Sequence, residues 1–259
     1  METKRMKPDG HTGLKKCFEN FIVGDSNRFA VEVAKAVAFR SILVELYNPL
    51  FIYGDTGLGK THLLHAIENA ILAADPDAKV KYVTGEAFTN EIINAIMEQK
   101  VKDFQEEYLN LDCLLVDDIQ FFEGKERTQE EFFHIINTLE ENNRQIIVSS
   151  RCHPNMMDKL EERLRTRLVG GLAVDIQPPD LETRIAILRQ KAEKDNIDVP
   201  DDVIQAIAER IESNVSMLEG ALNWIVAYAK LMPCPVFNLE TIAIALEAYN
   251  PKADVKFMK

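Results

Sequence analysis

One segment of the sequence combines glycines, a lysine and a threonine at the spacing that phosphate binding requires. The run Gly54-Asp-Thr-Gly-Leu-Gly-Lys-Thr61 matches G-x-x-x-x-G-K-[ST] in full, after the strand-like run 50–53 and before a helix predicted to open at Thr61. The glycines let successive backbone N–H groups turn toward phosphate oxygens, and the helix N-terminus adds partial positive charge. We expect Lys60 to reach the β and γ phosphates and the Thr61 hydroxyl to coordinate Mg²⁺.

The predicted nucleotide-binding set extends over this whole loop and one residue beyond it. It comprises Gly54, Thr56, Gly57, Leu58, Gly59, Lys60, Thr61 and His62. The alternative is a glycine-rich turn that only joins a strand to a helix. The complete pattern in its strand-to-helix context favours phosphate binding.

A second run ends in two carboxylates. Cys113-Leu-Leu-Val-Asp-Asp118 has the pattern of a buried strand whose carboxyl end opens onto a ligand crevice. We expect Asp117 to be the protein's carboxylate partner for Mg²⁺. Asp118 stands where a base would polarise an attacking water, and the alternative is a solvated aspartate at a strand end.

Short apolar runs rich in β-forming residues alternate with helical stretches in the first two thirds of the chain. The expected strands are 50–53, 80–83, 114–116, 146–149 and 172–176, and helices such as 61–73, 86–99 and 128–141 separate most of them. This alternation predicts an α/β domain with a parallel sheet covered on both faces.

The character of the sequence changes after Gln177-Pro-Pro179. The following segments 181–194, 201–212, 214–231 and 238–248 are predicted helices with no strand between them, and Asp201 and Asn214 are the expected N-caps of two of them. We therefore expect a disordered tail over 1–13, an α/β domain over 14–178, a helical domain over 179–250 and a second tail over 251–259.

The net charge limits the kinds of ligand contact that are plausible. The sequence carries 42 acidic and 30 basic residues, a formal charge of −12. Proteins that hold DNA mainly by neutralising phosphates usually carry a basic face. Any contact with nucleic acid must then be local, made by a few placed cations.

Composition and cysteine spacing point to an ordinary intracellular protein. No apolar run approaches spanning length, and no hydrophobic stretch follows the basic residues of the first ten positions, so we expect no integral membrane segment, no signal peptide and a cytoplasmic location. The cysteines Cys17, Cys113, Cys152 and Cys234 form no C-x-x-C pair, which favours reduced structural thiols.

Several longer runs resemble one family, the bacterial replication initiator DnaA. They are Phe18-Glu-Asn-Phe-Ile-Val-Gly-Asp-Ser-Asn-Arg-Phe-Ala30, Tyr47-Asn-Pro-Leu-Phe-Ile-Tyr-Gly54, Leu115-Val-Asp-Asp-Ile-Gln-Phe-Phe122, Lys125-Glu-Arg-Thr-Gln-Glu-Glu-Phe-Phe133, Asp175-Ile-Gln-Pro-Pro-Asp-Leu-Glu-Thr-Arg184, and Ser213-Asn-Val with Leu218-Glu-Gly-Ala-Leu222. The resemblance covers roughly 18–250. It implies an AAA+ P-loop fold with a five-stranded parallel sheet and a small all-α lid, and an ATP-controlled oligomer that acts at a replication origin.

The resemblance also shows what the chain lacks. A complete initiator carries an N-terminal partner-binding domain and a C-terminal domain that reads duplex origin boxes, and the residues before 18 and after 248 are too few for either. The chain is either an excised core or a short paralogue comparable to the family's regulatory members. The sequence leaves both origins open.

The resemblance assigns roles to residues around the nucleotide. Ile22, Val23 and Asn27 lie where relatives pack the adenine ring, with plain core packing as the alternative. Arg163 and Arg167 correspond to arginines that relatives present to the ATP of a neighbouring subunit, and Arg167 is our choice for the arginine finger. A solvated basic helix face is the alternative. Head-to-tail self-association through shared ATP is thereby implied, and the expected cofactors are ATP or ADP with Mg²⁺.

The resemblance places a single-stranded DNA site on one apolar and two basic residues. These are Ile93, Lys125 and Arg127, residue types that suit strand binding. Solvated charges in a polar loop are the alternative. Other replication proteins are possible partners of an initiator module.

Two residues depart from the family's pattern. Arg151 stands after the run 146–150, where relatives have an acidic sensor, and Ser216 stands where relatives have a lid arginine that reaches the γ-phosphate. Serine is neutral and short, so we expect nucleotide binding to survive and hydrolysis to be impaired.

Three functions remain open at this point. The first is a nucleotide-switched assembly module for replication initiation. The second is an active ATPase, such as a helicase-loader-like protein or a regulator of the initiator, favoured by Lys60, Thr61 and Asp117 and opposed by Arg151 and Ser216. The third is a protein-binding paralogue that has lost the switch.

Overall fold

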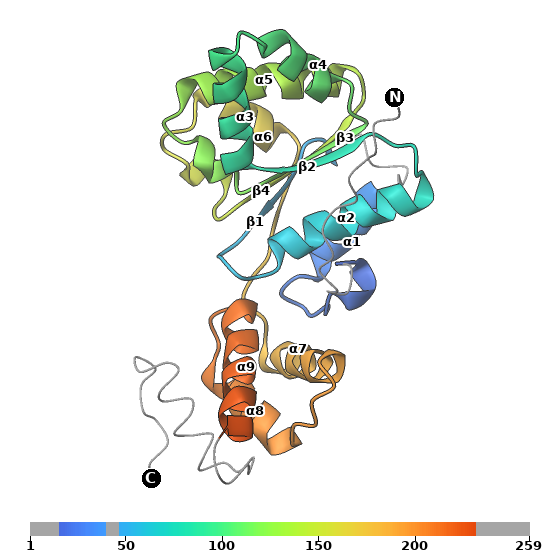
Figure 1. Cartoon of the computed structure of the whole chain (residues 1–259), viewed down its shortest axis with the longest axis vertical. Coiled ribbons are helices and arrows are strands. Elements are labelled where there is room, and N and C mark those ends of the chain that lie inside the picture. Colours follow the sequence, from blue (N-terminus) through green and yellow to red (C-terminus); the bar gives the residue numbers. More distant parts are fainter. Residues whose placement is uncertain (1–15, 40–46, 232–259) are drawn as a thin grey trace.

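The computed structural model describes residues 16–39 and 47–231 (Figure 1). Its centre is a parallel sheet of five strands in the order β2-β3-β4-β1-β5. The strands are β1 (Leu50–Tyr53), β2 (Val80–Thr84), β3 (Cys113–Asp117), β4 (Gln145–Ser150) and β5 (Leu172–Asp175). The expected parallel sheet is confirmed; β1 has the predicted bounds, and no end of the other strands differs from the predicted one by more than one residue.

Helices cover both faces of the sheet. On one face lie α1 (Arg28–Ala38) and α2 (Lys60–Ala74), and on the other lie α3 (Gly85–Met97), α4 (Val101–Leu109), α5 (Glu126–Glu141) and α6 (Glu162–Gly170), as Figure 1 shows. Short 3-10 turns are η1 (Phe18–Asn20), η3 (Ile119–Phe122) and η4 (Pro154–Met156). The central strands are buried on both faces, which is why they appear as continuous apolar runs.

Three further helices form a separate layer below the sheet in Figure 1. They are α7 (Leu181–Lys194), α8 (Asp201–Arg210) and α9 (Val215–Leu231), and they bury an apolar cluster of their own. The predicted helix 238–248, Cys234 and both predicted tails (1–13 and 251–259) lie outside the described residues.

The caps of these helices only partly follow the expectation. Asn214 caps α9 as expected: its Oδ1 accepts the N–H of Met217 at 2.8 Å. The expectation for Asp201 is wrong, since α8 already begins at that residue and Pro200 is its N-cap. Asp201 and Asp202 instead place their charges in the first turn, where the helix dipole favours them.

An aromatic cluster fixes α3, α4 and α5 against one face of the sheet. Phe88 lies at its centre, with ring centroids 5.1–5.4 Å from those of Phe104, Tyr108, Phe122 and Phe132. Phe88 is fully buried, so its ring holds three helices and η3 in place at once.

We expect Phe88→Ala to lower the free energy of unfolding by about 3–5 kcal/mol, because it removes a fully buried ring and leaves a cavity. Urea denaturation followed by far-UV circular dichroism measures this. Phe29→Ala is the matched control, since Phe29 is 63% exposed and its loss should change stability by less than about 0.5 kcal/mol. Equal effects of the two substitutions would contradict the central role of Phe88.

Candidate phosphate-binding site

The loop between β1 and α2 has the conformation that its glycines allow. Gly57 and Gly59 have φ angles of +81° and +99°, in the region that favours glycine. A Cβ on Gly57 would lie 2.8 Å from Oδ1 of Asn214, and a Cβ on Gly59 would lie 2.9 Å from the ring of Phe21. Glycine is therefore required both for the turn and for the close approach of two neighbouring segments.

Lys60 is the buried cation of this loop. It is 6% exposed, and its Nζ donates to the carbonyls of Gly54 at 2.5 Å and Asp55 at 2.8 Å. Burial lowers the pKa of Lys60, against the opposing effect of the carboxylates of Asp118 and Asp117. The ammonium group is thus already desolvated, which strengthens its interaction with an anion in the loop.

Asp117 ends β3 beside this loop and accepts three hydrogen bonds from hydroxyl groups. Thr61 donates to it at 2.6 Å, Tyr82 of β2 at 2.9 Å, and Ser149 of β4 also donates. Burial, followed by the charge of Asp117, raises the pKa of the Tyr82 phenol, so this hydroxyl remains a donor.

The oxygens around Asp117 fit a small hard cation. A threonine hydroxyl next to a carboxylate supplies ligands of the kind that Mg²⁺ takes together with phosphate oxygens and water. Within the described residues, no group of three or more His, Cys, Asp and Glu side chains could hold a metal by itself. The site fits a metal that arrives with a phosphate ligand and does not form an all-protein metal site.

Asp118 is held by Ser149 near the end of β4 and by Gln120 of η3. Its φ angle is +58°, its N–H donates to Ser149 Oγ at 2.9 Å, and its Oδ1 accepts from Gln120 Nε2 at 2.8 Å. Gln120 Oε1 in turn accepts the backbone N–H of Arg151 at 3.3 Å. In the described part of the chain Arg151 makes no ion pair with Asp117 or Asp118, and its positive charge contributes to lowering the pKa of Lys60.

These groups open into a cavity of about 610 Å³ between the sheet domain and the helical domain. Its lining includes Lys16, Asn20, Phe21, Ile22, Ser26, Asn27, Thr56, Gly57, Leu58, Gly59, Lys60, Thr61, His62, Asp118, Ile176, Gln177, Pro179, Ile187, Gln190, Lys191, Lys194, Val215, Ser216 and Glu219. The cavity is large enough for a nucleotide-sized ligand.

Of the three residues predicted to pack the adenine, two line this cavity. Val23 does not, and it is 42% exposed, so its predicted place in the cavity wall is wrong. Asn27 is buried, and its amide donates to the Ile22 carbonyl and accepts the Gly24 N–H, both at 3.0 Å. These bonds curl the segment, so that Ile22 faces the cavity and its neighbour faces solvent.

His62 is held at the back of the cavity. Its ring packs edge-on against Phe21 with centroids 5.2 Å apart, and its Nε2 lies 3.1 Å from the Cys17 carbonyl. Burial lowers the pKa of His62, which favours the neutral ring. Phe21 was not singled out from the sequence, although it lies within the run that carries the family resemblance.

The helical domain closes the other side of the cavity. The N–H of Val215 donates to the Gly57 carbonyl at 3.0 Å, so the start of α9 rests directly on the phosphate loop. One face of α7 also lines the cavity through Ile187, Gln190, Lys191 and Lys194, whose spacing is that of a single helical face. The sequence analysis missed this face, because an amphipathic helix does not reveal which partner it faces.

The predicted arginine finger lies away from this cavity. Arg167 of α6 donates from Nε to Asn137 Oδ1 at 2.7 Å and pairs with Glu140 at 3.1 Å, both on α5. Arg163 pairs with Glu161 at 2.7 Å and lies over the ring of Phe133. Neither arginine lines the chain's own cavity.

The predicted DNA-contacting residues lie around the start of α5 and on α3. Ile93 is 46% exposed on α3, and Lys125 is the N-cap residue of α5. Arg127 pairs with Glu130 and Glu131, each at 2.8 Å, on the same helix.

The strand order, a phosphate loop after β1, carboxylates after β3 and a helical lid define a P-loop nucleotide-binding domain of the AAA+ class. The chain also matches the family model for the bacterial DnaA ATPase domain over residues 14–175. It belongs to that family.

Individual relatives agree with this assignment. The chain is 54% identical over 227 residues to the chromosomal replication initiator protein DnaA of Symbiobacterium thermophilum, which covers 88% of this chain and 49% of the relative. It is 53% identical over 233 residues to DnaA of Levilactobacillus brevis, covering 90% of this chain and 51% of the relative. The chain thus spans about half the length of the curated relatives it matches.

Solved structures show the same fold. Domain III of the Thermotoga maritima initiator DnaA superposes with a TM-score of 0.85 at 37% identity, covering 92% of this chain and 98% of that one. A replication initiator DnaA bound to AMPPCP and single-stranded DNA superposes with a TM-score of 0.76 at 39% identity, covering 88% and 68%. Among the described residues, no helix is both long enough and apolar enough to cross a membrane.

We expect Lys60→Ala to weaken binding of an ATP analogue by at least about tenfold, because it removes the desolvated charge inside the loop. Titration with a fluorescent analogue measures the affinity, and circular dichroism checks that the fold persists. Lys35→Ala is the control, since Lys35 forms only an exposed pair with Glu32 on α1. Unchanged affinity in Lys60→Ala would rule out the phosphate site.

Proposed function

We propose that this chain is the ATP-binding AAA+ module of a DnaA-like replication initiator, which assembles in an ATP-dependent way and engages single-stranded origin DNA. The observation that carries the proposal is the complete phosphate loop beside Asp117, closed by a lid that rests on Gly57. Support comes from the family match and from the relative solved with AMPPCP and single-stranded DNA.

In the proposed complex, ATP or ADP lies in the 610 Å³ cavity with Mg²⁺. Loop N–H groups and Lys60 hold the β and γ phosphates, while Thr61 and Asp117 hold the metal shell. Asp118 orients an attacking water, because Gln120 fixes its carboxylate at the cavity wall. Phe21 and Ile22 pack the base.

Assembly is proposed to occur head to tail, with Arg167 reaching the nucleotide of the next subunit. The position of Arg167 on α6, away from its own cavity, is compatible only with a contact in trans if it touches a nucleotide at all. A contact between two different faces repeats without closing on itself and builds a filament. Such a filament would align the Ile93, Lys125 and Arg127 sites of successive subunits along one strand.

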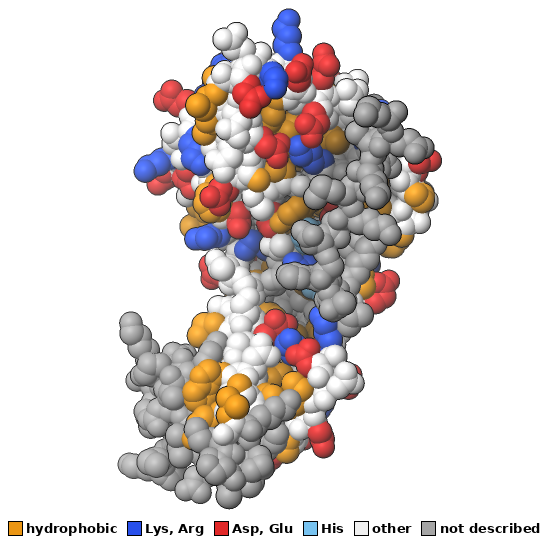
Figure 2. Space-filling view, viewed as in Figure 1, with side chains coloured by type: hydrophobic (Ala, Val, Ile, Leu, Met, Phe, Trp, Pro, Cys, Tyr) orange, Lys and Arg blue, Asp and Glu red, His pale blue; other side chains and the backbone are white. Residues whose placement is uncertain are grey.

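The chain's charge is consistent with a short-range DNA contact. On the face shown in Figure 2, acidic and basic side chains of the described residues are interspersed over the sheet domain. With a net charge of −12, long-range attraction of DNA is weak, and the strand must be held by a few cations and apolar contacts. Other replication proteins are proposed partners of the assembled form.

An active ATPase, acting as a regulator or helicase-loader-like paralogue, is the second candidate. The intact arrangement of Lys60, Thr61 and Asp117 favours it. Ser216 at the lid and Arg151 at the end of β4 oppose it, because neither supplies the charge that relatives place at these positions.

Two measurements made side by side distinguish these functions. The proposed initiator module should form larger species on size-exclusion chromatography with ATP than with ADP, and should turn over ATP slowly. Fast turnover without nucleotide-dependent assembly would instead support the ATPase. If the chain shows no ATP turnover and no nucleotide-dependent assembly, the remaining function is that of a protein-binding paralogue.

We expect Arg167→Ala to leave the ATP affinity of the monomer within about twofold of the wild type and to abolish ATP-dependent oligomers, because a planar guanidinium meets two γ-phosphate oxygens at once. Sizing by light scattering with ATP measures this. Arg189→Ala is the matched control, since Arg189 forms an exposed pair with Asp201 in the lid. Oligomers that persist in Arg167→Ala would shift the role to Arg163.

We expect the wild-type chain to bind ATP and ADP but to hydrolyse ATP slowly, and the double variant Ser216→Arg with Arg151→Asp to gain rate. A single placed arginine is worth about 10³ or more in phosphoryl transfer, and Ser216 lines the cavity where that charge would act. Single-turnover hydrolysis at saturating ATP, under conditions that allow oligomers, measures both single variants and the double. A fast wild-type rate with no gain in the double variant would refute this expectation.

A further inference from the structure

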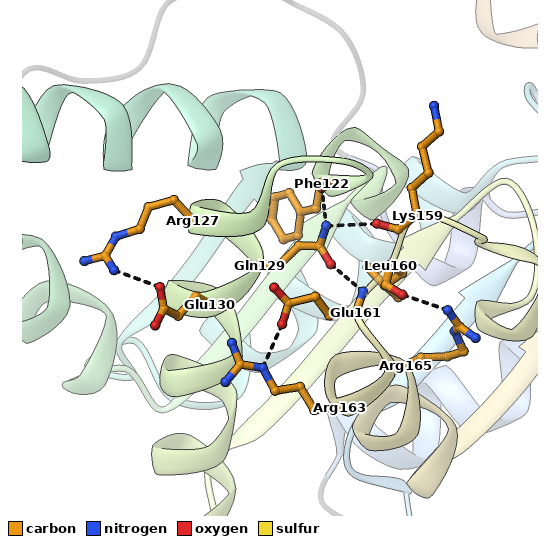
Figure 3. A network of polar contacts seen from close by, with 9 residues as sticks. All are labelled: Phe122, Arg127, Gln129, Glu130, Lys159, Leu160, Glu161, Arg163 and Arg165. Carbon is orange, nitrogen blue, oxygen red and sulfur yellow. Dashed lines mark hydrogen bonds and ion pairs between the residues drawn. The ribbon is translucent and has the colours of Figure 1, made fainter.

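A buried glutamine joins the region of the predicted DNA contacts to the helix that carries the predicted arginine finger. Gln129 of α5 is 1% exposed. Its Nε2 donates to the Phe122 carbonyl at 2.9 Å and the Lys159 carbonyl at 3.1 Å, and its Oε1 accepts the Glu161 N–H at 2.6 Å. Only one orientation of the amide satisfies two acceptors and one donor in this way. Figure 3 shows these contacts.

The segments that meet at Gln129 are those that present the two candidate sites. Phe122 ends η3, three residues before Lys125, and Arg127 lies two residues before Gln129 on α5 itself. Glu161 is the N-cap residue of α6, and its carboxylate pairs with Arg163. The Gln129 amide therefore contacts both the loop that carries the proposed DNA-binding residue Lys125 and the N-cap residue of α6.

Backbone contacts reinforce the same junction. The N–H of Gly124 donates to the Lys159 carbonyl at 3.2 Å, so that carbonyl accepts from both Gly124 and Gln129. A buried amide with all its hydrogen bonds made is costly to disturb, because any movement leaves polar groups unpaired. The loop 122–125 and the turn 159–161 are thus held as one unit.

The other end of the exposed face of α6 is also attached to α5. Arg167 donates to Asn137 at 2.7 Å and pairs with Glu140. Gln129 and Asn137 lie eight positions apart on one helix, and Glu161 and Arg167 six positions apart along α6. These two polar attachments add to the packing of the buried Leu164 and Leu168 and set the direction of α6 against α5.

We propose that Gln129 is a positioning residue that couples single-stranded DNA binding to ATP-dependent contact between subunits, an inference that rests on the proposed function. A neighbour's nucleotide that engages Arg167 sets the position of α6, and Gln129 transmits that position to Lys125 and Arg127. Binding of single-stranded DNA then strengthens the contact with the neighbouring subunit's nucleotide, and that contact strengthens DNA binding to the same extent. Without the amide, only the backbone bond from Gly124 to Lys159 and the contacts of Arg167 with α5 join the two sites, and the coupling is weaker.

The test compares the affinity of a fluorescent oligothymidylate for the chain with ADP and with a non-hydrolysable ATP analogue. In the wild type we expect the oligonucleotide to bind at least about tenfold more tightly with the analogue, and in Gln129→Met we expect this ratio to fall by at least about threefold. Methionine keeps the length of the side chain and removes all three hydrogen bonds. The affinity for the ATP analogue alone should stay within about twofold of the wild type, since Gln129 does not line the cavity.

Gln145→Met is the matched control. Gln145 is the first residue of β4, and its amide donates to the Tyr47 carbonyl. This end of the strands lies opposite the phosphate loop, so Gln145→Met should keep the wild-type affinity ratio. A folded Gln129→Met variant with the wild-type ratio would overturn the coupling and leave the proposed function standing. A wild-type chain that binds the strand in neither nucleotide state would overturn both.

A second measurement needs no variant and decides the matter if Gln129→Met does not fold. Hydrogen exchange of the wild type with ADP is followed with and without oligothymidylate. We expect the strand to slow exchange in the segment 159–167, which carries the Glu161 N–H but none of the proposed strand contacts. Saturating strand that protects Lys125 and Arg127 while leaving 159–167 unchanged would overturn the coupling.

Discussion

The carboxylate of Asp117 is the group around which the carboxyl edge of the sheet is organised. It is 3% exposed, and a buried charge of this kind is tolerated only when hydrogen bonds replace the lost water. Thr61, Tyr82 and Ser149 supply those bonds from the start of α2, from β2 and from β4. Because Thr61 is the last residue of the phosphate loop, the bond that satisfies the carboxylate also fixes where the loop lies. The Thr61 hydroxyl and the Asp117 carboxylate are also the ligands proposed for Mg²⁺, so the bond that stabilises the buried charge also prepares the proposed metal site.

The lid rests on this edge through the start of α9 and is tied internally near the linker. Near the linker, Arg184 is 8% exposed and donates to the carbonyls of Pro179 at 2.8 Å and Ala208 at 2.7 Å, which ties the linker to α8. At the cavity, Val215 donates to Gly57. The first contact lies within the lid and its linker, and the second joins the lid to the phosphate loop. The start of α9 is therefore the point at which the proposed nucleotide would act on the lid through the phosphate loop.

The sequence predicted those features that depend on local pattern. The loop 54–61 was recognised because its glycines, lysine and threonine are contiguous, and the parallel sheet followed from strand-helix alternation. The features that were missed depend on which segments meet in space. Tyr82 reaches Asp117 only because β2 lies next to β3, and Val23 turns to solvent only because Asn27 bonds back to its own segment. The helices α1 and α4 were not predicted, and α4 lacks a capping side chain that would mark its start.

The arginines proposed to meet anionic ligands are each held by a carboxylate in the isolated chain. Arg127 pairs with Glu130 and Glu131, and Arg167 with Glu140. A phosphate must compete with these carboxylates, so the net gain on binding is smaller than for a free cation, and the contact is favourable only where geometry is good. With an overall charge of −12, the chain repels polyanions at a distance, so the proposed DNA contact depends on short-range exchange of such pairs together with Lys125 and Ile93. An assembly, in which many weak and oriented contacts act together, is therefore favoured. A single subunit that holds DNA by charge alone is disfavoured.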